Sequence, residues 1–171
     1  YSKEVQKHEF PFVDKTIDKD TRNLSAYFVG AGHAIKKEVF INCGLYPEDY
    51  FYGKEELDLS LRAINNNFTL VYNPNVEVFH KQSPKGRQKN DEKWMQVYRN
   101  RLVISYKYYP FFYKIVINTL WFVKIFLISE SILVPINGYK RYLLVKNSLI
   151  KNILTKEAIS YIKNNYGRLY Y

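Results

Sequence analysis

Cysteine and methionine are almost absent from this chain of 171 residues, which contains one of each. A single cysteine, Cys43, cannot form an intramolecular disulfide, and no Cys/His cluster has the spacing of a structural zinc site. We therefore expect a reducing, cytosolic environment. Because the methionine is Met95 and residue 1 is Tyr1, we also expect the sequence to be the C-terminal part of a longer protein or a processed product.

Long uncharged apolar runs are also missing. The most hydrophobic stretch, 108–136, is interrupted by Lys114, Lys124 and Glu130, so its longest uncharged piece covers only residues 115–123. A membrane-spanning helix needs about 20 apolar residues, and a central lysine costs roughly 2.5–3.5 kcal/mol on insertion. Interleaved aromatic and lysine side chains instead favour a helix lying in the membrane interface; the alternative is a helix packed on the protein's own core. We find no pattern of a cleavable signal peptide.

Acidic residues are scarce in the second half of the chain. Residues 81–171 carry 17 Lys/Arg against 4 Asp/Glu, a net charge of +13, whereas residues 1–80 carry 9 against 12, a net charge of −3. This asymmetry indicates contact with a polyanion, unless it forms only a solvated basic face. Because no motif that reads nucleic acid accompanies the basic residues, we expect an anionic membrane surface as partner and no nucleic acid.

The apolar content, 47% hydrophobic and 18% aromatic residues, is ample for a folded core and excludes wholesale disorder. Local patterns predict an α/β layer, residues 1–93, followed by a mainly α-helical tail, residues 94–171. The layer should contain strands at 26–29, 70–72 and 76–79 and helices at 36–42 and 54–66. Proline and glycine should divide the helical tail at Pro110, Pro135 and Gly138.

The candidate catalytic residues are acids at the predicted start of the helix at 54–66: Glu55, Glu56 and Asp58. A carboxylate in the first turn of a helix is stabilised in its ionised form, so it can accept a proton as a general base. Successive helical residues are about 100° apart, so Glu55 and Glu56 cannot point the same way. The alternative is that these acids only cap and solubilise the helix.

Two further groups are candidates for binding. His80 ends the last predicted strand, where an α/β sheet places ligands, and an imidazole is a common metal ligand. The basic residues that follow, Lys81, Lys85 and Arg87, would hold a diphosphate beside that metal unless the loop is only solvated. His33, just after Gly32 in a glycine-rich turn, is expected to face the same cleft.

In this order, the pieces resemble the C-terminal half of the catalytic domain of family 2 glycosyltransferases, particularly the bacterial rhamnosyltransferase-like members. The resemblance covers about residues 25–112. The segments that match are Gly30-Ala31-Gly32-His33, Gly53-Lys54-Glu55-Glu56-Leu57-Asp58, Tyr72-Asn73-Pro74, Val78-Phe79-His80 and Arg99-Asn100.

The resemblance implies a GT-A fold and an inverting transfer of a sugar from a nucleotide-diphosphate donor to an acceptor hydroxyl, in the synthesis of a surface polysaccharide. It implies that Glu56 is the base, that Glu55 and Asp58 orient the acceptor or brace the helix, and that His80 helps to bind Mg²⁺ or Mn²⁺. Gly32 and His33 would face the acceptor, a saccharide or lipid-linked saccharide at the cytoplasmic face of the membrane. The family's nucleotide-binding strands and Asp-x-Asp motif have no counterpart here, since Asp18-Lys19-Asp20 follows no hydrophobic strand. We therefore expect an acceptor half that is inactive alone; the alternative is a non-catalytic module that binds a membrane surface or a partner.

Overall fold

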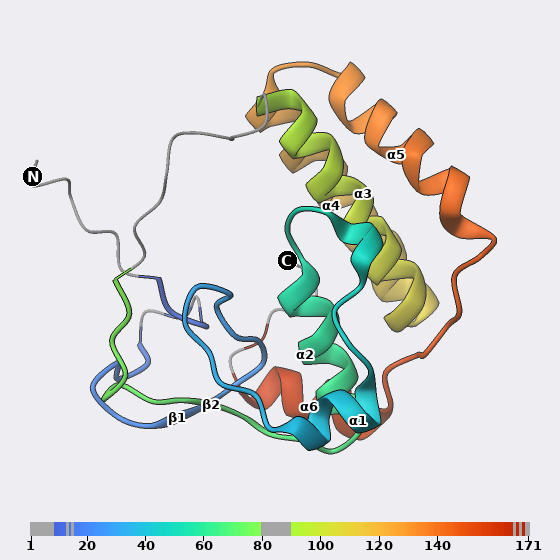
Figure 1. The fold of residues 1–171 in the computed structure, drawn as a ribbon. Helices are drawn as coiled ribbons and strands as arrows, with labels where there is room; N and C mark the ends of the chain where they lie inside the picture. The colour runs from blue at the N-terminus through green and yellow to red at the C-terminus, as the bar shows by residue number, and fades with distance from the viewer. Residues whose placement is uncertain are drawn as a thin grey trace, which may run out of the picture.

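The structure is a computed structural model that describes residues 9–12, 14, 16–79, 90–165, 167 and 169. Its described elements follow the order β1 (Asn23–Ser25), α1 (Lys37–Cys43), a 3₁₀ turn (Glu48–Tyr50), α2 (Glu55–Asn65), β2 (Leu70–Tyr72), α3 (Asn90–Tyr108), α4 (Phe111–Ser129), α5 (Leu133–Lys146) and α6 (Lys156–Asn164). The fold is therefore mixed, with a small sheet and a predominance of helix (Figure 1).

The sheet consists of β1 and β2, which pair antiparallel with Leu24 opposite Val71. A two-stranded sheet is marginal by itself, so it needs another element to pack against it. Tyr161 of α6 supplies this contact, because its hydroxyl accepts a hydrogen bond from the Leu70 amide at 3.0 Å and donates to the Ser25 carbonyl at 3.1 Å. The sheet is thereby fastened to the C-terminal part of the chain.

The two helices between the strands confirm their sequence predictions. Gly44 ends α1 at a φ of 79°, and its amide donates to the Phe40 carbonyl. In α2 the predicted apolar stripe faces inward, with Leu61 and Ile64 buried and Leu57 packed against the core. Helix α2 therefore has one apolar face and an acidic first turn.

Helices α3, α4 and α5 pack together at one end of the molecule, while α2 and α6 lie between them and the sheet (Figure 1). The core runs through this packing, with Leu102, Ile104 and Ile117 almost fully buried. After α5 the chain returns along the end of α3, where the Asn152 amide donates to the Lys107 carbonyl at 2.8 Å. The helical tail predicted from Trp94 onward is thus confirmed as helix, and its α6 packs on α2.

Two of the predicted strands are wrong. Residues 26–29 form no strand, because the Ser25 hydroxyl accepts a hydrogen bond from the Tyr27 amide and so turns the chain out of the ladder. Residues 76–79 also form no strand; they follow a turn in which the Asn75 amide donates to the Asn73 side chain. The α/β class holds only in the coarser sense of a mixed fold.

Two predicted breaks in the tail are also wrong, since Pro135 and Gly138 both lie within α5. Proline is tolerated in the first turn of a helix, where its missing N–H has no helical partner, and Pro135 occupies such a position. Gly138 is buried against Tyr98 of α3, so its lack of a side chain serves close helix packing. Pro110 does separate α3 from α4, as predicted.

Candidate functional site

The loop before α2 has an unusual backbone that aims the first turn of the helix. Phe51 and Lys54 both adopt positive φ angles, 48° and 80°, and Gly53 between them has a φ of 78°. Non-glycine residues seldom occupy this region, and such conformations persist only where the surroundings enforce them. The loop therefore needs outside support.

That support comes from α3. The Asn100 amide group donates to the carbonyls of Tyr50, Tyr52 and Gly53 at 2.8, 3.1 and 2.8 Å. Beside it, the Arg99 guanidinium forms an ion pair with Asp49 at 2.7 Å. Asn100 is fully buried, so these bonds form away from water and fix the loop in place.

Glu56 is the acid that this arrangement directs toward the glycine-rich turn. Its carboxylate lies so close to Gly30 that a Cβ added there would be 1.9 Å from Oε1. Burial is the largest influence on the pKa of Glu56 and raises it, and the neighbouring Glu55 raises it further. A hydrogen bond from its own backbone amide and the nearby Lys54 and His33 act in the opposite direction, but the net shift of the pKa is upward. Glu56 is therefore a stronger base than an exposed glutamate, and glycine at position 30 leaves the room it occupies.

His33 lies on the same side as Glu56, whose pKa it helps to lower. Its Nε2 is 3.1 Å from the Tyr46 hydroxyl, and its ring contacts Phe28 with 4.8 Å between centroids. His33 is exposed, and Tyr46 and Phe28 are partly exposed. The neighbourhood of Glu56 thus has a polar and aromatic surface open to solvent.

At Gly32 the atoms nearest to an added Cβ belong to Val78, whereas at Gly30 they belong to Glu56. A Cβ added at Gly32 would be 2.8 Å from Cγ2 of Val78, so this glycine allows close packing of the segment after β2. Its predicted part in binding the acceptor stays a prediction.

Asp58 has a different environment from Glu56. It is fully buried, and its carboxylate accepts hydrogen bonds from the Tyr50 and Tyr108 hydroxyls at 2.8 and 2.9 Å. It also forms ion pairs with Lys107 at 2.8 Å and with Arg62 at 2.7 Å. With both oxygens occupied, Asp58 braces α2 against α3, which is one of the two parts that the resemblance implied for it.

These charges fix the ionisation of Asp58. Burial alone would raise its pKa, but Lys107, Arg62 and the Tyr50 hydroxyl outweigh that effect, so the pKa of Asp58 lies below its usual range. Glu55 differs from both: it is partly buried like Glu56, but its Oε2 is enclosed and has no hydrogen-bond partner among the described residues. The three acids of one helical turn therefore differ in what each carboxylate touches.

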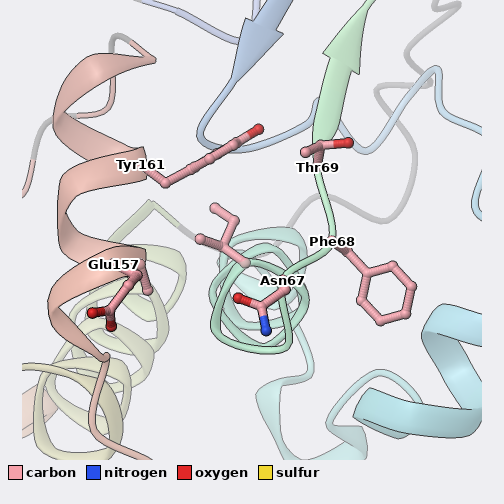
Figure 2. Close-up of a pocket in the computed structure, with 7 residues that line it drawn as sticks. Asn67, Phe68, Thr69, Glu157 and Tyr161 are labelled. Carbon is pink, nitrogen blue, oxygen red and sulfur yellow. The ribbon is translucent and has the colours of Figure 1, made fainter.

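A hollow of about 190 Å³ lies away from these acids, between the end of α2 and α6. Figure 2 shows Tyr161 reaching from α6 toward the start of β2 on its border. Its lining consists of Ile64, Asn67, Phe68, Thr69, Glu157, Ala158 and Tyr161. None of the acids predicted to be catalytic borders it.

The predicted metal and diphosphate ligands His80, Lys81, Lys85 and Arg87 lie outside the described residues. Within the described ranges, no three His, Cys, Asp or Glu side chains gather as a metal ion requires. The described side chains therefore do not form a centre for Mg²⁺ or Mn²⁺ by themselves, and this cofactor stays a prediction.

Sequence reasoning missed the partners of the acidic segment. Arg99 and Asn100 were noted only as part of the resemblance to the family, and Lys107 and Tyr108 were covered only by the prediction of a basic, aromatic tail. All four lie about 50 positions from the residues they bind, so no local periodicity indicates the contact.

Comparison with models of protein families, with curated proteins and with solved structures gave no match to this chain. One helix in the described part of the chain, α4, is long and apolar enough to cross a membrane by length and composition alone. Neither finding assigns a family, so function has to be argued from the site itself.

Proposed function

We propose that this chain is the acceptor-binding, base-carrying part of an inverting glycosyltransferase that transfers a sugar from a nucleotide-diphosphate donor to an acceptor hydroxyl. The observation that carries the proposal is the position of Glu56: partly buried, raised in pKa, and held against a glycine turn at the start of α2. A base with a pKa closer to neutrality both accepts and releases a proton effectively.

In the proposed reaction, Glu56 accepts the proton of the acceptor hydroxyl as that oxygen forms a bond to the anomeric carbon. The bond from this carbon to the donor's diphosphate breaks with its electron pair, and the diphosphate departs. His33 and Tyr46 would contact the acceptor, because they are accessible and lie on the same side as Glu56. Asp58 acts through α2 rather than on the substrate, since its oxygens are already bonded within the protein.

The proposal assigns donor binding to another part of the protein. The described residues offer only a two-stranded antiparallel sheet, whereas a nucleotide is bound at the carboxyl ends of parallel strands in α/β folds. We therefore expect no turnover of a nucleotide sugar by this chain alone, and measured turnover would refute this division.

The test of the base is Glu56→Gln in a protein that includes the donor-binding part. A general base contributes about 10²–10⁴-fold, so the rate of transfer should fall by that factor while acceptor binding persists. Glu38→Gln is the matched control, because Glu38 is an exposed acid in the first turn of α1. An unchanged rate in Glu56→Gln would rule out Glu56 as the base.

A second observation favours attachment to a membrane surface, with or without catalysis. Helix α4 buries Ile117, Trp121 and Ile125, four residues apart, on its inner face. Its outer face exposes large apolar side chains: Phe111, Phe112, Ile115, Leu120, Val123, Phe126 and Leu127. Single exposed apolar residues are ordinary, but a continuous row on one helix marks an interaction surface.

We propose that this outer face of α4 lies in the interface of an anionic membrane, at its cytoplasmic side. Sedimentation with vesicles tests it: Phe111→Ser combined with Phe112→Ser should weaken binding to vesicles rich in phosphatidylglycerol. Ile41→Ser is the control, because Ile41 is 70% exposed on α1. Equal binding by both variants would leave α4 out of the contact.

A further inference from the structure

Three cationic side chains meet at one indole ring beside the acid pair. The Nζ atoms of Lys54 and Lys124 lie 4.8 and 4.6 Å from the centre of the Trp121 ring, and the Arg101 guanidinium carbon lies 5.5 Å from it. They come from the loop before α2, from α4 and from α3. The indole ring attracts each cation, but three cations around a single ring also repel one another, and a bound anion would relieve that repulsion.

Arg101 is the most informative of the three. Only 1% of its surface is exposed, and its guanidinium donates a hydrogen bond to Tyr109. Its Nε and Nη2 atoms are buried and have no hydrogen-bond partner among the described residues. A buried cation with unused donors is costly unless an acceptor completes it, and Arg101 has no ion pair with a carboxylate in the described part of the chain.

Lys54 experiences the same excess of positive charge. The pKa of Lys54 is lowered to about 8, first by burial and then by repulsion from Arg101 and Lys124, which outweighs the opposite effect of Glu56 and Glu55. The acid pair therefore does not balance the cations. An anion is the ligand that would bring a compensating charge to this place.

We propose that Lys54, Arg101 and Lys124 bind a phosphate group beside the Glu55–Glu56 pair. A phosphate has a charge close to −2 and several acceptor oxygens, which suits more than one cation, and a guanidinium donates to it in a fixed fork. Lys54 and Lys124 are partly exposed and meet the ligand from the surface, while the buried Arg101 donates its unused Nε and Nη2 hydrogens to the ligand from the interior.

The site does not require Glu56 to be a base; only its assignment to a phosphorylated acceptor rests on the proposed function. Lys54 directly precedes the acid pair, so a phosphate held there would belong to the molecule whose hydroxyl reacts. A lipid-linked acceptor carries such a phosphate at the membrane surface, and the exposed face of α4 lies on the same helix as Lys124.

The experiment uses inorganic phosphate as the first probe, with ionic strength kept constant by sodium chloride. The chain has two tryptophans, so Trp94→Phe leaves Trp121 as the reporter of fluorescence. We expect a saturable change on adding phosphate. Lys54→Gln and Lys124→Gln should each weaken the affinity about tenfold, the loss expected for one charge-assisted hydrogen bond. Lys156→Gln, which removes an exposed lysine of α6, should leave the affinity unchanged.

Vesicles distinguish the source of the phosphate. Phosphatidylcholine vesicles with phosphatidic acid are compared with vesicles whose equal charge comes from fatty-acid carboxylates. A Lys54-dependent response to phosphatidic acid identifies a lipid phosphate, whereas a response to inorganic phosphate alone identifies a soluble phosphorylated ligand; both support the site. The absence of any saturable response, an equal response in all lysine variants, or an equal Lys54-dependent response to the carboxylate vesicles would overturn it.

Two measurements distinguish a loss of phosphate binding from a loss of folding and from an error in the assignment of the base. Thermal unfolding should show Lys54→Gln and Lys124→Gln folded, and Lys124→Gln tests the site independently should the other variant unfold. Glu56→Gln removes a negative charge beside the site and should still bind phosphate, at least as tightly as the parent chain, so a wrong base and a wrong phosphate site give different results.

Discussion

Replacing Asp58 by Asn should destabilise the fold far more than replacing either neighbouring glutamate. The Asp58 side chain is 1% exposed, and its ion-pair partners Lys107 and Arg62 are 19% and 13% exposed. Asparagine would leave both cations without their counter-ion, and breaking a buried ion pair costs about 3–5 kcal/mol. It would also place an NH₂ group against the donors Tyr50 and Tyr108 if the amide nitrogen took the position of Oδ2.

The measurement is urea unfolding followed by circular dichroism, with the slope m checked for each variant. Asp91→Asn is the control, since Asp91 is an exposed acid in the first turn of α3 and its loss should cost at most about 1 kcal/mol. Glu56→Gln should be close to neutral, because burial disfavours the charge it removes. Unfolding thus distinguishes Asp58, which braces α2, from Glu56, the acid proposed to react.

A double variant tests whether Asp58 and Lys107 are energetically coupled. Lys107→Met removes the cation that Asp58→Asn leaves unpaired, so the two changes together should cost less than the sum of the single costs. A loss below about 1 kcal/mol in Asp58→Asn, or strict additivity in the double variant, would refute the view of Asp58 as the hub of a buried charge network.

Three further outcomes follow from the same contacts. The lowered pKa of Asp58 means that the native state binds fewer protons than the unfolded state near pH 3–4, so urea midpoints should fall as pH drops through that range and fall less steeply in Asp58→Asn. Asn100→Ala should cost at least about 2 kcal/mol in thermal or urea unfolding, because three loop carbonyls lose their donor. Gly138→Ala should cost about 1–3 kcal/mol by the same measurement, since the new Cβ would lie 3.0 Å from both the Met95 carbonyl oxygen and Tyr98.

Local patterns predicted the elements whose causes are local. The apolar spacing and acidic start of α2, and the glycine that ends α1, lie within a few residues of the helices they define. The segments 26–29 and 76–79 have strand-like composition, but a strand forms only where a partner strand is available. Here β2 pairs with β1, and the Ser25 hydroxyl and the Asn73 turn take the chain out of the ladder on either side.

The acids of the candidate site could be predicted from the sequence, but the residues of α3 that hold them in place could not. The spacing placed Glu55, Glu56 and Asp58 in one helical turn, and it indicated that the carboxylates would face different ways. Which acid would be buried depended on Lys107 and Tyr108, which approach α2 only after the chain has folded back. Charge counting likewise indicated a basic second half without showing that Arg101 would be buried inside it.

The contact between Lys54 and Trp121 places the proposed phosphate site next to the helix that is proposed to lie on the membrane. Trp121 lies on the inner face of α4, whose outer face carries the exposed apolar row, and Lys54 is followed directly by the acid pair. A membrane that contacts α4 would therefore lie one helix thickness, about 10 Å, from the start of α2. Under the two proposals, an acceptor hydroxyl that reaches Glu56 from such a membrane is only a short distance from the lipid phosphates. The proposals therefore favour a short saccharide on a lipid phosphate, rather than a long saccharide chain in solution, as the acceptor.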